Sequence, residues 1–142
     1  MKGKPGDPIG LTRDSEWQIG VRRTIPVSVE KLWEMIISKK GIAIWLGAGP
    51  EFKFQVGEEY ILTDGTEGRI RVYHPYSHLR ISRQPVDPSY DHPALIQIRI
   101  LASGVKSVLA FHEEHLPSES ERQKRKTFYL GVVDQIKNAL DL

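Results

Sequence analysis

Residues 24–47, TIPVSVEKLWEMIISKKGIAIWLG, contain the pattern that decides the fold. Pro26 cannot continue the interior of a strand, and Ser28 suits the position just before a first helical turn. The apolar side chains that follow recur at the spacing i, i+3, i+4, i+7 and i+8, which is one face of a helix: Val29, Leu32, Trp33, Ile36 and Ile37. The sequence therefore predicts an amphipathic helix that begins near Val27.

Gly41 is expected to break this helix. A second short helix is predicted directly afterwards, with its apolar side chains on the same core: Ile42, Trp45 and Leu46. Upstream, apolar side chains alternate with polar or small ones over residues 17–25, which is the period of a half-buried strand. Residues 1–13, rich in proline and glycine, are expected to form a flexible arm ahead of a single domain of residues 14–142.

Composition narrows the class of protein. A chain of 142 residues can bury about two-thirds of its unfolded surface around one core. Its net charge of +2 is too small to favour a general nucleic-acid or membrane surface, and the absence of cysteine excludes disulfides and thiolate chemistry. No apolar run reaches the roughly 20 residues that a membrane helix needs, and the start of the chain lacks the apolar core of a signal peptide. We therefore expect a cytoplasmic protein.

Further strands and one long helix follow along the chain. Alternating segments bounded by turn residues predict five more strands, at residues 60–62, 68–74, 79–83, 94–102 and 105–114. The proline-rich segment 84–93 is expected to form an extended loop at the rim of the sheet. A long helix is predicted from about Pro117 to Leu142, because apolar residues repeat there every four positions: Phe128, Val132, Ile136 and Leu140.

This order of elements predicts an α+β fold of the helix-grip type, in which a curved antiparallel sheet wraps around a long C-terminal helix. An antiparallel sheet with one apolar face must cover that face. A helix of about 25 residues is about 37 Å long, which is enough to cross the sheet. Because a bent sheet and a straight helix do not pack flush everywhere, a pocket is expected between them.

Several short segments resemble a known family by their order and spacing: Ile25-Pro26 to Trp33, Trp45-Leu46-Gly47, Phe54-x-Val56-Gly57, Gly68 with Tyr73-His74-Pro75 and Leu79, and Gly131-Val132 to Leu140. The chain resembles the SRPBCC superfamily, in the branch similar to the activator of the heat-shock chaperone ATPase. The resemblance implies the helix-grip fold. One position departs from the family, which often has Trp where this chain has Val132, and the smaller side chain could enlarge a cavity.

Alternation identifies the apolar side chains expected to line that pocket: Ile70, Val72, Ile96, Ile98, Ile100, Leu109 and Phe111 from the strands, with Phe128, Val132 and Ile136 from the terminal helix. Arg23 and Arg83 fall on inward faces by parity, where a guanidinium could meet a carboxylate or phenolate ligand. Tyr60 could donate a hydrogen bond to a ligand carbonyl. A filled core would use the same apolar residues, so it remains the alternative.

Catalytic and metal-binding patterns are sparse. His112 and His115 are three positions apart, so on a strand they point to opposite faces and cannot share a metal. His74 and His78 flank a turn, where a pair is conceivable. The sequence has no GxSxG, no HExxH and no phosphate-binding glycine loop. We expect no metal and no cofactor, and the basic run at residues 122–126 is interpreted as a solvated helix face.

The leading functional hypothesis is binding of a hydrophobic small molecule, such as a lipid, polyketide or aromatic metabolite, between the sheet and the terminal helix. The alternative is a protein-interaction module that presents a surface to a chaperone or another protein partner. A cyclase or dehydratase of the same superfamily is a third hypothesis, because such sites are built from scattered pocket residues.

Overall fold

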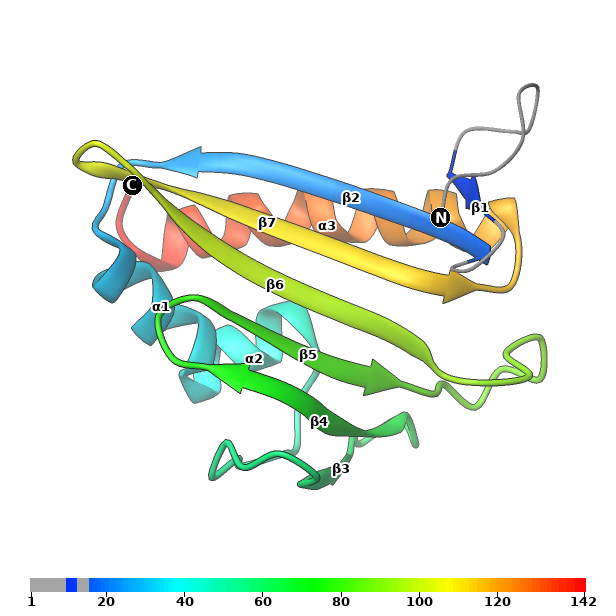
Figure 1. Ribbon diagram of the computed structural model, residues 1–142. Helices are drawn as coiled ribbons and strands as arrows, with labels where there is room; N and C mark the ends of the chain where they lie inside the picture. The colour runs from blue at the N-terminus through cyan, green and yellow to red at the C-terminus, as the bar shows by residue number, and fades with distance from the viewer. Residues whose placement is uncertain (1–9, 13–15) are drawn as a thin grey trace.

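The computed structural model describes residues 10–12 and 16–142 (Figure 1). Its elements are β1 (Leu11–Thr12), β2 (Glu16–Ile25), α1 (Val29–Ile37), α2 (Lys39–Trp45), β3 (Glu59–Ile61), β4 (Glu67–His74), β5 (His78–Arg83), β6 (Ala94–Ser103), β7 (Lys106–Leu116) and α3 (Glu119–Ala139). The strands form one antiparallel sheet in the order β1-β2-β7-β6-β5-β4-β3.

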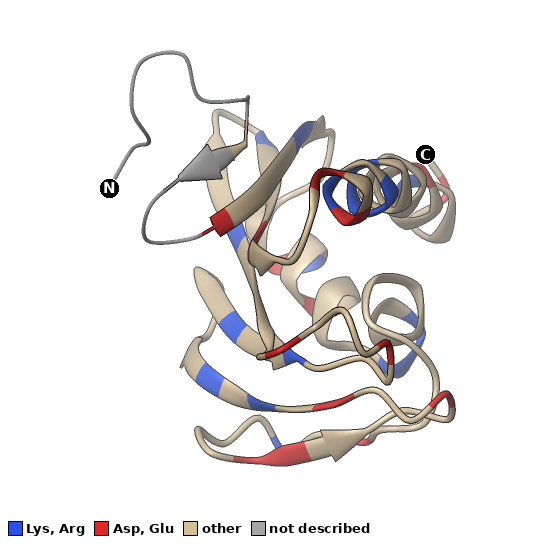
Figure 2. Ribbon diagram, turned by 90° about the vertical axis from the view of Figure 1, so that its right-hand side faces the viewer, with Lys and Arg blue, Asp and Glu red and all other residues tan. Residues whose placement is uncertain are grey.

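All three helices of the described residues lie on one face of this sheet (Figures 1 and 2). The long helix α3 packs against β2 and β7, while α1 packs against β6 and β7. None of the described helices lies on the opposite face, which is called the helix-free face below. This arrangement confirms the predicted α+β helix-grip fold.

The break between α1 and α2 falls at Ser38, and the predicted break at Gly41 is wrong. The Ser38 N–H donates to the carbonyl oxygen of Met35 and ends α1, while the Ser38 hydroxyl accepts a hydrogen bond from the Gly41 N–H at 3.0 Å and caps α2. Gly41 therefore lies inside α2. It is glycine because a Cβ atom there would collide with the Met35 carbonyl oxygen.

The prediction that Val72 shares a face with Ile70 is also wrong. The β4–β5 ladder pairs Ile70 with Ile81 but Val72 with Arg80, because the register shifts between these two pairs. A bulge of this kind inserts one extra residue and reverses the sense of alternation beyond it. Val72 is thus turned to the helix-free face, and Tyr73 takes the inner position opposite Leu79.

The helix α3 begins after Ser118, whose hydroxyl accepts a hydrogen bond from the Glu121 N–H at 3.1 Å. Its buried side is formed by Tyr129, Val132, Val133 and Ile136. Phe128, predicted to line the interior, lies half-buried at the margin of this stripe. The predicted C-terminal end of the helix agrees with that of α3 within a few residues. The buried face differs from the predicted one, because it includes Tyr129 in place of Phe128.

Most of the predicted N-terminal arm lies outside the described residues. Within the described part, Leu11 pairs with Trp17 and Thr12 with Glu16, so this short segment forms the edge strand β1. None of the helices in the described ranges is long and apolar enough to cross a membrane.

Candidate functional site

The apolar side chains predicted to line a pocket meet between the sheet and α3. They lie at most 3% exposed in one packed cluster: Ile70, Ile96, Ile98, Ile100, Leu109, Phe111, Val132 and Ile136. The Phe111 ring stacks on the ring of Tyr129, with centroids 5.0 Å apart. The pronounced hollows found along residues 16–142 open elsewhere on the surface. The residues thus have the packing of a filled core.

Beneath the N-terminal half of α3, this core contains a buried polar network centred on Glu113. The carboxylate is 0% exposed and accepts a hydrogen bond from Arg83 Nε at 2.6 Å and from Arg125 Nε at 2.6 Å. The Tyr129 hydroxyl donates to the same carboxylate at 2.8 Å. Two arginines and one tyrosine from β5 and α3 therefore converge on one glutamate of β7.

The electrostatics of this network fix the protonation state of each member. Burial alone would raise the pKa of Glu113, but the adjacent guanidiniums of Arg125 and Arg83 lower it below the usual range. Burial raises the pKa of Tyr129, and the negative charge of Glu113 raises it further. Near neutral pH the glutamate stays ionised and the tyrosine stays protonated. A general acid or base would need a pKa near the working pH.

The network extends to the proline-rich loop through Tyr90. Arg83 Nη2 donates to the Tyr90 hydroxyl at 2.8 Å, and that hydroxyl donates to Glu121 of α3 at 2.8 Å. Burial raises the pKa of Tyr90 to about 12. The loop, predicted as an excursion at the rim of the sheet, is therefore anchored in the interior by its one buried aromatic side chain.

The Tyr60 hydroxyl forms its hydrogen bond with the backbone of β5. It donates to the carbonyl oxygen of Ser82 at 2.6 Å, and the Ser82 hydroxyl in turn accepts the Arg69 N–H at 2.9 Å. Gly68 is needed beside this hydrogen bond, because a Cβ atom there would collide with the Ser82 carbonyl group and would lie 2.8 Å from Tyr60 Cε1. Burial raises the pKa of Tyr60, so its hydroxyl remains a hydrogen-bond donor.

The three polar candidates of the sequence are therefore not brought together. Arg83 enters the Glu113 network, and Tyr60 bonds to the backbone of β5. Arg23 lies at the edge of α3, where its guanidinium donates to Asp134 at 3.1 Å in an exposed ion pair.

Sequence reasoning missed Glu113, Arg125 and Tyr129, although two signals pointed to them. Glu113 continues the inward parity of Leu109 and Phe111 on β7. Arg125 and Tyr129 are four residues apart on α3, so they lie on one helix face. The basic run at residues 122–126 is not wholly a solvated helix face, because the Arg125 side chain is 14% exposed and paired with Glu113.

A second feature of the inner face is a strip of aromatic rings that begins at Trp33. Trp33 contacts Tyr73 and Tyr76 at centroid distances of 5.9 and 6.2 Å, and Tyr73 stacks on Phe54 at 5.1 Å. Phe52 continues the strip at 5.4 Å from Phe54. Trp33 is 1% exposed, and its indole N–H has no hydrogen-bond partner among the described residues.

The histidines do not assemble a metal site within the described ranges, where no group of three or more His, Asp and Glu side chains is suited to a metal ion. His74 and His78 are paired across β4 and β5 with ring centroids 4.6 Å apart. His112 Nε2 lies 2.8 Å from Gln18 Oε1, and His115 lies 4.0 Å from Glu16.

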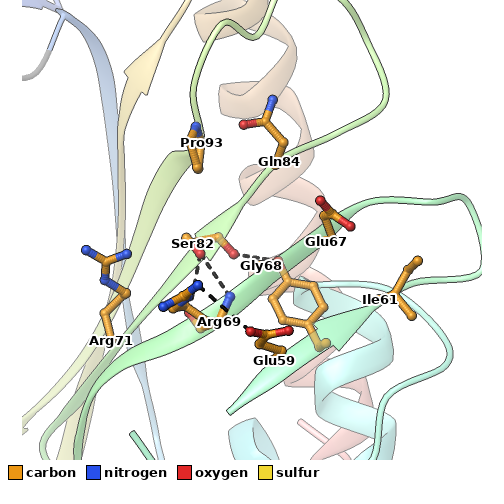
Figure 3. A pocket seen from close by; sticks show the side chains of 10 residues that line it. Glu59, Ile61, Glu67, Gly68, Arg69, Arg71, Ser82, Gln84 and Pro93 are labelled. Carbon is orange, nitrogen blue, oxygen red and sulfur yellow. Dashed lines mark hydrogen bonds and ion pairs between the residues drawn. The ribbon is translucent and has the colours of Figure 1, made fainter. Parts of the chain in front are cut away.

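Two of the larger hollows lie on the helix-free face of the sheet. One of about 660 Å³ is lined from β3, β4 and β5 and contains Arg69 and Arg71 (Figure 3). A neighbouring hollow of about 410 Å³ shares Arg71, Ser82 and Pro93 with it. Both are open and partly polar, unlike an enclosed ligand cavity.

The comparisons with known proteins identify the family. The family model described as Activator of Hsp90 ATPase homolog 1-like protein matches residues 26–141. The chain therefore belongs to this family, within the SRPBCC superfamily. No curated protein matches the sequence significantly.

Solved structures share the fold at low sequence identity. CalU16 from Micromonospora echinospora is 17% identical, with a TM-score of 0.74 over 87% of this chain and 73% of that chain. Protein MLL2253 from Mesorhizobium loti is 19% identical, with a TM-score of 0.75 over 87% and 96% of the two chains. The Aha1 dimer from Colwellia psychrerythraea is 16% identical, with a TM-score of 0.63 over 84% and 96%. At these identities the likeness concerns the fold alone.

Proposed function

We propose that this protein is a protein-binding module that acts on an Hsp90-type chaperone, in the manner that the family description implies. The observation that carries the proposal is the filled interior. The side chains expected to line a ligand pocket pack against one another, and the buried carboxylate of Glu113 is already paired with Arg83 and Arg125. A protein with no preformed cavity under its helix acts more readily through its surface.

The experiment is an ATPase assay with a purified Hsp90-type chaperone, to which the intact chain is added in increasing amounts. A saturable rise in the ATPase rate, matched by direct binding in a calorimetric titration, supports the proposal. A rate that stays constant, with no binding heat up to concentrations far above typical micromolar affinities, would contradict it.

A second candidate function is supported by the aromatic strip. Flat rings that are half-buried, such as Phe54 and Tyr73, next to the unpartnered indole N–H of Trp33, suit a small aromatic molecule that carries a hydrogen-bond acceptor. This candidate keeps the small-molecule hypothesis but places the ligand beside α1 and not between the sheet and α3. Near neutral pH Glu113 stays ionised and Tyr129 stays protonated, so neither group is suited to the proton transfer that a cyclase or a dehydratase would need.

A panel of flavonoids, fatty acids and other apolar compounds tests the second candidate by thermal melting. A ligand of the strip raises the melting temperature in a concentration-dependent way, and Phe54→Ala removes that rise. Val105→Ala is the matched control, because Val105 is 90% exposed on the β6–β7 turn. Failure of every compound, or a rise that Phe54→Ala leaves unchanged, would contradict binding at the strip.

A further inference from the structure

The helix-free face of the sheet is rich in arginine. Outward positions on four strands carry Arg22, Arg69, Arg71, Arg80 and Arg99, and Figure 2 shows blue segments on the strands at the side away from the helices. The register places Arg22 and Arg99 in one row across the sheet. Arg22 is opposite Ala110, which is opposite Arg99, which in turn is opposite His78.

Few acidic side chains balance this charge. Glu114 on β7 and Glu67 on β4 share the outward face, and Glu59 on the edge strand lies 3.8 Å from Arg69. Within the part of the chain that the structure describes, no carboxylate forms an ion pair with Arg71, Arg80 or Arg99. The Arg80 guanidinium donates at 2.8 Å to a neutral amide, that of Gln97. Among the described residues the face therefore keeps a net positive charge, with five arginines against three carboxylates.

The shape of the face suits a broad contact. Gly20 and Ala110 have little or no side chain, so no bulky group protrudes from these two positions near the centre of the face. A hollow of about 230 Å³ next to them is lined by Arg80, Leu95, Gln97, His112 and Glu114. Guanidinium groups present planar forks that match carboxylates in pairs of parallel hydrogen bonds. The effect of the charge is already visible within the face, since burial and then the positive charges of Arg99, His74 and Arg80 lower the pKa of His78.

We propose that this arginine face binds an acidic surface of a folded protein partner. The proposal rests on the proposed function in one respect, because it takes the Hsp90-type chaperone as the partner with the acidic surface. The outward positions of these strands carry no Phe, Tyr or Trp, so the face lacks the rings on which single-stranded nucleic acids stack. Its centre also lacks a large exposed apolar group that could enter a bilayer.

The test uses two charge-reversal variants with the same net charge. Arg80→Glu with Arg99→Glu changes the face, while Lys40→Glu with Lys126→Glu changes exposed positions on α2 and α3. Each reversal lowers the charge by two, so both variants move from +2 to −2. Binding of the purified chaperone is measured by calorimetry at two salt concentrations, and folding of each variant is checked by its melting curve.

The arginine variant is expected to lose about tenfold in affinity and to show a weaker salt dependence, because charges at an interface act through complementarity. The lysine variant should stay within about twofold of the wild type, since isolated surface charges contribute little. Equal losses in the two variants, or no loss in the arginine variant, would overturn the proposal.

A wild type that does not bind the chaperone at all contradicts the proposed function but not yet the arginine face. The face is then tested with poly-L-glutamate as an acidic polypeptide. Retention of the wild type and the lysine variant, with loss in the arginine variant, supports it. No retention of the wild type, equal retention of all three proteins, or tighter binding to anionic vesicles or oligonucleotides than to poly-L-glutamate overturns it.

Discussion

Glu113→Gln tests the buried network, because it removes one charge and leaves the packing almost unchanged. In the wild type the carboxylate accepts hydrogen bonds from Arg83, Arg125 and Tyr129 while 0% exposed. With an amide in its place, two guanidinium charges remain in the interior without their counter-ion. Removal of one partner from a buried ion pair costs about 3–5 kcal/mol. Since two arginines share this glutamate, we expect a loss near the upper end of that range.

The loss is measured by urea unfolding, followed by circular dichroism and tryptophan fluorescence. The pKa of Glu113 is lower in the folded protein than in the unfolded chain. The ionised carboxylate therefore adds fully to the free energy of unfolding above the unfolded-state pKa of about 4.3, and this stabilisation is lost as the pH falls through the folded-state pKa. The difference between wild type and variant should therefore be full at neutral pH and shrink below about pH 4. As a control, replacement of Arg83, Glu113 and Arg125 together by Met, Leu and Met should cost much less than the single change.

A loss below about 1 kcal/mol for Glu113→Gln at neutral pH would refute the reasoning. The reasoning is also wrong if the difference in free energy of unfolding between wild type and variant stays unchanged at acidic pH, because that difference would then not come from the ionised carboxylate.

The remaining predictions concern alkaline stability, the core and the α1–α2 junction. The folded pKa values of Tyr60, Tyr90 and Tyr129 are raised, so unfolding should become easier above about pH 10, by about 1.4 kcal/mol per pH unit for each tyrosine. Urea titrations from neutral to alkaline pH measure how the free energy of unfolding falls with pH. Tyr129→Phe should reduce this slope by one third, and an unchanged slope would contradict a raised folded-state pKa for Tyr129. Val132→Trp should cost at least about 1–3 kcal/mol, since Val132 is 0% exposed in a filled core; a rise in melting temperature would indicate a void at that position. Gly41→Ala should destabilise the protein, because the added Cβ atom would collide with the Met35 carbonyl oxygen. Gly131→Ala on α3 should stabilise the protein by up to about 1 kcal/mol, because the added Cβ atom would meet only the flexible Gln135 side chain, at 3.9 Å. The opposite order in thermal melting would contradict the junction geometry.

The order of elements was predictable because each segment follows one period. The i, i+3, i+4 spacing over 29–37 and the alternation in β2, β6 and β7 agree with the helices and strands observed. Errors arose where one residue changes the local geometry. Ser38 supplies both caps at the α1–α2 junction, and Gly41, which looks like a breaker, is needed for close approach. The bulge that turns Val72 outward leaves no mark in the alternation of the sequence.

The candidate site was harder to predict, because its members are far apart in the sequence. Parity placed Arg83 inward, but it could not tell that a glutamate 30 residues away on β7 would neutralise it. Arg125 lies within a run of charged residues and differs from its neighbours only by facing the sheet. A pocket and a filled core use the same apolar residues, so alternation alone could not choose between them.

The most direct test of the central claim is to map the surface that a partner covers. Amide resonances of the isotope-labelled chain are recorded by NMR while an unlabelled Hsp90-type chaperone is added. We predict shifts or broadening confined to the arginine face, at residues such as Arg22, Arg80, Arg99 and His112. Perturbations that cluster instead on α3 and the Glu113 network, with the arginine face unaffected, would contradict the central claim.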